Sequence, residues 1–407
     1  MHNRQLFDRI VFSALAASLM LWLASNFFAT VWYAKTPLVA TDKQKGDAFG
    51  AVTAIEGDTI VVGAPYASFG NARSGTAYVF VRSGSGWVQQ AKLVPTGNPL
   101  TWQGFGETLS ISGDTIAVGV PGVKGKVYIF TRHGTTWSEQ AKLTPPAQSK
   151  GSFASSVALD DDVLVVSDLG MAHVFLRDAA TNSWAYQTTL TPNPVLEYEE
   201  GGSVAISNGV IVMRGSGRAL VFGRASDGGT WQQQAELAIP AGRKAGVYTV
   251  AISDDTIIVG ACSEHVGFDI ASIGAVHVFE RELDTGEWTY RTRLTPRGVR
   301  RGEAIDLTRF LSPYGFGSSI AIDGDVIVVG ARTQSSLMPS QESAAYLFQR
   351  HPSRTGQWVQ RAKLFVDNVE VSGNAVASVS VANKDVVLIG QFGAFVLNID
   401  APSALKQ

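Results

Sequence analysis

The stretch from Phe49 to Leu93 reads FGAVTAIEGDTIVVGAP, then a polar loop, then GTAYVFVR, a short turn and WVQQAKL. It contains four apolar runs, rich in Val, Ile, Tyr and Trp, each with the length of a β-strand. They are Ala51–Ile55, Thr59–Val62, Thr76–Val81 and Trp87–Leu93. Glu56-Gly57-Asp58 separates the first two runs and is typical of a tight hairpin turn. The stretch therefore predicts a four-stranded antiparallel unit.

The same unit recurs along the chain at a spacing of about fifty residues. The second copy starts at Gly104 and the sixth at Phe316, while the seventh, from Asn374, stops after its third strand. A tandem array of four-stranded units is the signature of a β-propeller, with one blade for each unit. We therefore predict an all-β fold, a seven-bladed β-propeller of four-stranded antiparallel blades.

A closed ring needs the missing fourth strand of the seventh unit from the other end of the chain, because an open ring would leave exposed sheet edges. Val31-Trp32-Tyr33-Ala34-Lys35 precedes the first unit. Its Ala34-Lys35 matches Ala91-Lys92 in the fourth strand of that unit. We predict that residues 31–38 complete blade seven.

Composition narrows the classes of function. The formal net charge of −2 gives no overall reason to expect nucleic acid as a partner. Cys262 is the only cysteine, so the chain can form neither an internal disulfide nor a cysteine metal cluster. Charged residues make up 17% of the sequence and 42 residues are glycine, which suits short strands joined by tight turns better than long helices.

The amino-terminal segment, residues 1–30, has the features of an export signal and predicts a hydrophobic helix. Arg4 and Arg9 precede a long apolar run, which predicts that the amino end stays in the cytoplasm and the rest of the chain is exported. The segment is either an uncleaved single-pass anchor in the cell membrane or the cleaved signal peptide of a secreted protein. The propeller then spans residues 31–400, and residues 401–407 form a C-terminal tail.

The recurring motifs FG-x-x-V-A, GD-x-I-V-V-G-A-P, G-x-A-Y-V-F and W-x-x-Q-A-K-L resemble the FG-GAP repeat family. The resemblance covers about Val31 to Asp400. It implies the seven-bladed propeller of the integrin α type, common in bacterial and protist surface proteins, and a role in adhesion or ligand binding. The calcium loops of that family are shortened here to forms such as Glu56-Gly57-Asp58, with too few oxygens for a calcium site, so no cofactor is expected.

The polar and aromatic residues that repeat have structural explanations. Six aspartates occupy the turn between the first and second strands, where Asp is favoured for backbone reasons; they are Asp58, Asp114, Asp162, Asp255, Asp325 and Asp385. His173 and His277 take the third-strand position of Tyr78, which indicates half-buried strand residues. One tryptophan per blade, such as Trp87, is expected to pack on the outer strand. We predict no catalytic and no metal-binding residue.

The parts that do not repeat are the better candidates for function. Connections from the second to the third strand, and from the fourth strand to the next blade, lie on one face of a propeller, here termed the loop-rich face. The opposite face, termed the hairpin face, carries the other turns. Binding residues concentrate in variable loops on a rigid scaffold. The candidate ligand-binding residues in longer loops of the loop-rich face are Trp102, His265, Arg297, Arg300, Arg301, Arg309, Tyr314 and Arg332.

The arginines near Tyr314 predict contact with an acidic protein or glycan, because Arg and aromatic residues are enriched at interface hot spots. The sequence thus predicts a non-catalytic extracytoplasmic module that recognises a protein or a carbohydrate. Two alternatives stay open. One is a glycan-active enzyme, a lyase or hydrolase, with acidic, His or Tyr side chains converging in the central funnel. The other is a structural subunit of a surface assembly, which would carry a large apolar patch on its rim.

Overall fold

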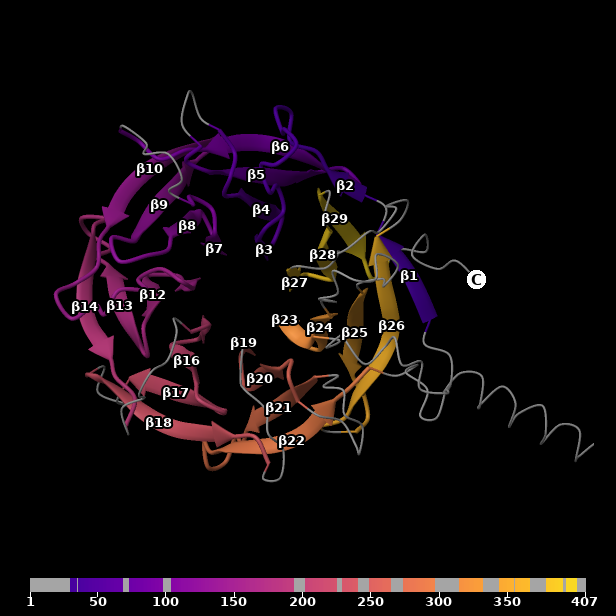
Figure 1. Ribbon diagram of the computed structural model, residues 1–407. Coiled ribbons are helices and arrows are strands. Elements are labelled where there is room, and N and C mark those ends of the chain that lie inside the picture. The colour runs from indigo at the N-terminus through magenta and orange to yellow at the C-terminus, as the bar shows by residue number, and fades with distance from the viewer. Residues whose placement is uncertain are drawn as a thin grey trace, which may run out of the picture.

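The computed structural model describes residues 30–34, 36–68, 73–97, 104–193, 202–224, 229–240, 249–264, 274–296, 315–331, 344–354, 356–366, 378–390 and 393–400. Within them the chain forms seven sheets in a ring around a central axis (Figure 1). Each blade has four antiparallel strands, and blade six carries a fifth strand on its outer edge. The predicted seven-bladed all-β propeller is confirmed.

The first four blades follow one another along the chain, each with its first strand nearest the axis (Figure 1). Blade one contains β3 (Thr53–Glu56), β4 (Thr59–Ala64), β5 (Thr76–Ser83) and β6 (Gly86–Leu93). Blade two contains β7 (Thr108–Ser112), β8 (Thr115–Val120), β9 (Lys126–His133) and β10 (Thr136–Leu143). Blade three contains β11 (Val157–Asp160), β12 (Val163–Asp168), β13 (Met171–Arg177) and β14 (Trp184–Leu190). Blade four contains β15 (Val204–Ser207), β16 (Val210–Gly215), β17 (Arg218–Arg224) and β18 (Trp231–Ala238).

The last three blades complete the ring. Blade five contains β19 (Thr249–Ser253), β20 (Thr256–Ala261), β21 (Ala275–Arg281) and β22 (Trp288–Leu294). Blade six contains β23 (Phe316–Asp323), β24 (Val326–Ala331), β25 (Ala344–Arg350) and β26 (Trp358–Val366), with β1 (Thr30–Ala34) outside β26. Blade seven contains β27 (Val379–Ala382), β28 (Asp385–Gly390) and β29 (Gly393–Asn398), with β2 (Thr36–Leu38) outside β29.

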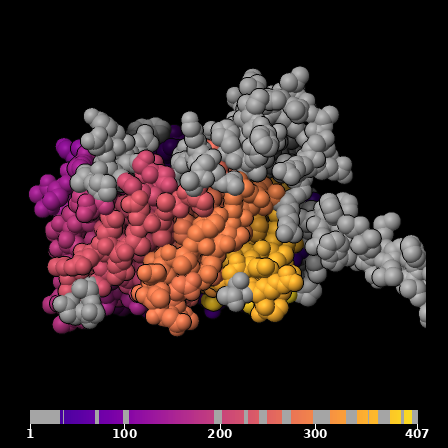
Figure 2. Space-filling view, turned by 90° about the horizontal axis from the view of Figure 1, so that it is seen from below, coloured from indigo at the N-terminus to yellow at the C-terminus, as the bar shows by residue number. Residues whose placement is uncertain are grey.

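The second strands are largely apolar along their length because both faces of each sheet are covered by neighbouring blades. Every residue of β4, β8 and β24 is buried. The outer strands are more exposed and alternate, as in β18. Consecutive blades lie side by side along the rim in Figure 2, in the order of the sequence. The apolar core is therefore distributed over the interfaces between blades.

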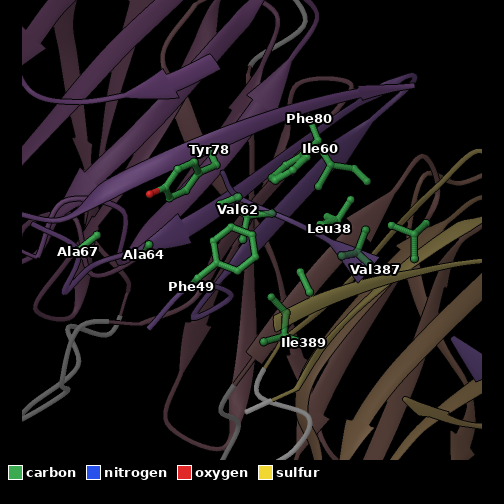
Figure 3. Close-up of a cluster of buried hydrophobic side chains, with 13 residues drawn as sticks. Leu38, Phe49, Ile60, Val62, Ala64, Ala67, Tyr78, Phe80, Val387 and Ile389 are labelled. Atoms are coloured by element: carbon green, nitrogen blue, oxygen red, sulfur yellow. The ribbon is translucent and has the colours of Figure 1, made fainter. Parts of the chain in front are cut away.

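The interface between blades seven and one shows how the Phe of each Phe-Gly motif contributes to this core (Figure 3). Phe49 lies between Ile389 of blade seven and the third strand of blade one. Its ring packs edge-on against Tyr78 and Phe80, with centroid distances of 5.4 and 6.1 Å. The interface of blades one and two repeats this geometry around Phe105. Edge-to-face aromatic pairs add stability beyond area burial, so this repeated phenylalanine is a packing residue.

The segment 31–38, assigned by the sequence to blade seven, is divided between two blades. β2 pairs antiparallel with β29, and Leu38 lies opposite Ala394 just as Leu93 lies opposite Ala77 in blade one. β1 instead lies parallel to β26 in blade six. Trp32 packs against the apolar cluster between blades six and seven, and this contact gives the physical reason for the position of β1.

Both chain ends lie outside the described residues: 1–29, with the predicted hydrophobic helix, and 401–407. In the part of the chain that the structure does describe, no helix is long and apolar enough to cross a membrane.

A ring of hydrogen bonds joins the blades near the hairpin face. In six blades the last side chain of the first strand accepts a hydrogen bond from a backbone N–H in the hairpin turn of the next blade. For example, Ser112 accepts from the N–H of Asp161 at 3.0 Å. The six acceptors are Glu56, Ser112, Asp160, Ser207, Ser253 and Asp323. Each pairing satisfies a turn donor and fixes the stagger of two blades.

The junction that closes the ring uses a charged pair instead. Blade seven has Ala382 at the acceptor position, and alanine has no side-chain acceptor. Asp385, which is 1% exposed, takes the place held by Thr59 in blade one. Arg82 of blade one forms an ion pair with Asp385, whereas Arg132 at the next junction donates to the hydroxyl of Thr59 at 3.2 Å. A partly buried, charge-assisted hydrogen bond thus stabilises the closing junction.

Candidate binding face

All eight residues that the sequence predicts to bind a ligand lie outside the described residues. They are Trp102, His265, Arg297, Arg300, Arg301, Arg309, Tyr314 and Arg332. The structure does describe other connections of the same loop-rich face, at 39–52, 121–125 and 144–156. These connections, and the strand ends beside them, make up the part of the face that the structure describes.

On the hairpin face, arginines hold the turn aspartates. Arg132 donates to Asp114 through Nε at 2.6 Å, and its guanidinium carbon lies 5.2 Å from the centroid of Trp137. The Asp–Arg pair recurs in blades one, three and six, and the Arg–Trp stack recurs in blades one, three, four and six. The repeated side chains of this face therefore bind one another, and they build the blade.

His173 is fully buried rather than half-buried, because it has polar partners inside blade three. Its Nε2 lies 3.2 Å from Oδ2 of Asp168, and its Nδ1 lies 2.9 Å from the hydroxyl of Thr189. Burial raises the pKa of Asp168, but hydrogen bonds from His173 and from the backbone N–H groups of Leu169 and Ser152 outweigh it and hold this pKa well below its usual range. His173 therefore replaces the tyrosine of other blades as a packing residue.

His277 of blade five repeats this arrangement and is also fully buried. Its Nε2 lies 2.5 Å from Oε2 of Glu264, and Arg293 donates through Nε to the other oxygen of that carboxylate at 2.7 Å. Glu264 follows Cys262 in the loop that the sequence nominates around His265, yet its side chain is 0% exposed. The carboxylate is thus part of the blade interior and is not offered to a ligand.

Asp168→Asn is expected to destabilise the protein by about 2–3 kcal/mol at pH 7, because the buried carboxylate loses charge-assisted hydrogen bonds. The folded-state pKa lies below the unfolded value of about 3.9, so the stabilisation is present above that pH and is lost as the pH falls further. The difference between variant and parent should therefore shrink in urea unfolding at pH 3.5. Asp58→Asn, with an aspartate side chain that is 75% exposed, is the control and should cost less than about 1 kcal/mol. A difference that stays constant with pH would contradict this role of Asp168.

Over blades one to three, the loop-rich face carries lysines without carboxylate partners. Within the described residues none of the following five forms an ion pair, and we term them the lysine arc: Lys45, Lys124, Lys126, Lys142 and Lys150. Four of them are exposed, and Lys126 is half-buried. The sequence contains no motif for this arc, because the lysines come from separate connections of three blades.

Few exposed carboxylates accompany these lysines on the described part of the face. Asp42 is paired with Lys92, whereas Asp47 and Asp168 are buried, which leaves Glu107 exposed. Apolar side chains are also exposed on this face: Val39 is 63% exposed, Val123 77%, and Tyr66, in the connection between β4 and β5, 47%. The described part of the loop-rich face therefore presents both cationic and apolar side chains.

Comparison with family profiles identifies repeats of one type. The profile described as FG-GAP repeat matches residues 32–80 and 314–348, which include strands of blades one and six. The search of curated proteins found no match.

Many solved structures share the fold at low sequence identity. A candidate 6-phosphogluconolactonase from Bacteroides uniformis has a TM-score of 0.57 and 12% identity, covering 86% of this chain and 94% of its own. Sqt1 of Saccharomyces cerevisiae has a TM-score of 0.52 and 11% identity, covering 93% and 87%. A protein of the COPII outer coat vertex on membranes has a TM-score of 0.55 and 14% identity, covering 87% and 85%. Such similarity establishes the propeller and leaves its function to be argued from the surface.

Proposed function

The chain is a seven-bladed β-propeller that carries FG-GAP repeats, and from this premise we propose that it is a non-catalytic binding module. It recognises a protein or carbohydrate ligand through the loop-rich face. The proposal extends to location: residues 1–30 either anchor the chain in the cell membrane with the propeller outside, or are removed on secretion.

The contrast between the two faces carries the proposal. On the hairpin face, repeated aspartates and arginines bind each other, as Asp114 and Arg132 do. On the loop-rich face, the lysine arc has no carboxylate partners among the described residues, and side chains such as Tyr66 and Val123 are exposed. Exposed apolar and unpaired charged groups on rigidly held loops are the usual elements of a recognition surface.

A screen of the full-length chain against glycans and surface proteins tests the proposal. Among the ligands that bind, we expect Arg300→Ala/Arg301→Ala/Trp102→Ala to weaken binding by about tenfold or more, because arginines and tryptophans are enriched at hot spots. The matched control is Arg354→Ala on the hairpin face, where the arginine is exposed, and it should bind like the parent.

Two results would count against the proposal. Unchanged binding by the triple variant would remove the nominated loops from the binding face. Turnover of a glycan by the parent chain, with release of shortened or unsaturated products, would show that the module is catalytic.

A further inference from the structure

We propose that the lysine arc binds an anionic polysaccharide, a carbohydrate polymer with carboxylate or sulfate groups along its length. This inference rests on the proposed function, since it names the ligand class of the same loop-rich face. The lysine arc is separate from the arginine-rich loop around Arg300. It consists of described residues in the first part of the chain, over blades one to three.

The first argument is that the two faces carry opposite excesses of charge. Over blades one to three, the described loop-rich face has eight cationic residues, namely Lys43, Lys45, Arg73, Lys92, Lys124, Lys126, Lys142 and Lys150. It has five acidic residues, namely Asp42, Asp47, Glu107, Asp168 and Glu139, whose carboxylate accepts hydrogen bonds from Thr96 in the connection after β6, so the local balance is 8 − 5 = +3. The hairpin turns are instead rich in aspartate, as in Asp160-Asp161-Asp162. The formal net charge of −2 for the whole chain conceals this polarity.

The second argument is that the arc suits an extended ligand with several anionic groups. Lys45 lies in the connection before blade one, Lys124 in the connection between β8 and β9, and Lys126 at the start of β9. Lys142 lies near the end of β10, and Lys150 in the connection that follows β10. A ligand that meets all of them must reach from the connection before blade one to the connection between blades two and three. Lysine ammonium groups act as mobile point charges, without the fixed fork of arginine, and therefore suit anionic groups repeated along a flexible polymer. Tyr66 and Val123 on the same face provide apolar contact for the faces of sugar rings.

The same features disfavour other polyanions and acidic proteins. Single-stranded nucleic acid needs several aromatic side chains for successive bases, and Tyr66 is the exposed aromatic residue among the described connections of this face. Protein hot spots use Arg and aromatic anchors in pockets, whereas the unpaired cations here are lysines. Binding to an anionic bilayer needs apolar groups that insert more deeply into the lipid than the side chain of Val123 does.

The test measures binding of the full-length chain to a polyuronate and to a sulfated polysaccharide. Lys124→Glu/Lys150→Glu is expected to weaken binding by about tenfold or more, because two attractive contacts become repulsive. Arg354→Glu/Arg361→Glu is the matched control: both arginines are exposed, they lie outside the loop-rich face, and the change in net charge is the same. Raising the salt concentration should weaken binding of the parent more steeply than binding of the lysine variant.

The outcomes separate this inference from the proposed function. Equal losses in both double variants would reduce the effect to net charge and overturn the arc. Tighter binding to single-stranded DNA or to vesicles with anionic lipid than to either polysaccharide would overturn the ligand class. If the chain binds a neutral glycan or a protein and the lysine variant leaves that binding unchanged, the inference fails and the proposed function stands. Selective loss in the lysine variant supports it.

Discussion

A chain that begins at Val39 is expected to unfold at a temperature about 10 °C or more below that of a chain that begins at Thr36, because it lacks the strand that closes the ring while both chains lack β1. β2 is the fourth strand of blade seven, and its removal leaves β29 as an exposed edge. It also removes Leu38, which is 2% exposed in the cluster between blades seven and one. Thermal unfolding followed by circular dichroism measures the difference.

A single substitution isolates the buried contact from the loss of the strand. Leu38→Ala should cost about 2–5 kcal/mol, the usual range for truncating a buried leucine. Val39→Ala is the neighbouring control, since Val39 is 63% exposed, and it should change stability by about 0.5 kcal/mol or less. Equal stability of the two truncated chains would mean that the ring does not depend on β2.

The blades could be predicted because the sequence repeats the physical pattern of each one: four apolar runs, an Asp turn and a tryptophan. The register of the closing strand could not be read from local resemblance. Ala34-Lys35 matches Ala91-Lys92 in sequence, but Ala34 lies in β1 of blade six and not in the closing strand β2. Leu38 takes the place of Leu93 in the sheet. Burial of the terminal leucine decides the register, since a slip would expose it.

The candidate site was less accessible to sequence reasoning. The sequence predicts His173 and His277 as half-buried strand residues, and their full burial depends on Asp168 and Glu264, which the fold brings under the loop-rich face. The lysine arc is defined by the absence of a carboxylate partner for each lysine among the described residues. Pairing of charges across blades is a property of the three-dimensional arrangement, so composition and motifs carry no signal for it.

Gly106→Ala is expected to destabilise the protein by about 3 kcal/mol or more, because two separate costs fall on one residue. Gly106 follows the phenylalanine of the Phe-Gly motif and has a φ of +91°, which side-chain-bearing residues rarely adopt. A Cβ atom there would lie 2.6 Å from the backbone oxygen of Thr76 in the preceding blade. Urea unfolding of parent and variant measures the loss of stability. The close contact can also be relieved if the two blades move apart.

Gly57→Ala separates the two costs. Gly57 also has a positive φ, of +50°, but a Cβ atom would meet nothing within 4 Å, so this variant should cost about 1 kcal/mol. Gly63 completes the test, because its Cβ would lie 2.1 Å from the backbone oxygen of Gly106 itself. Gly63→Ala and Gly106→Ala should therefore be non-additive in a double-mutant cycle, since either one already forces the two blades apart. Equal costs for Gly57→Ala and Gly106→Ala would instead assign the Phe-Gly glycine to backbone conformation alone. Non-additivity would establish that the glycines of the Phe-Gly and Gly-Ala-Pro motifs form one contact between consecutive blades.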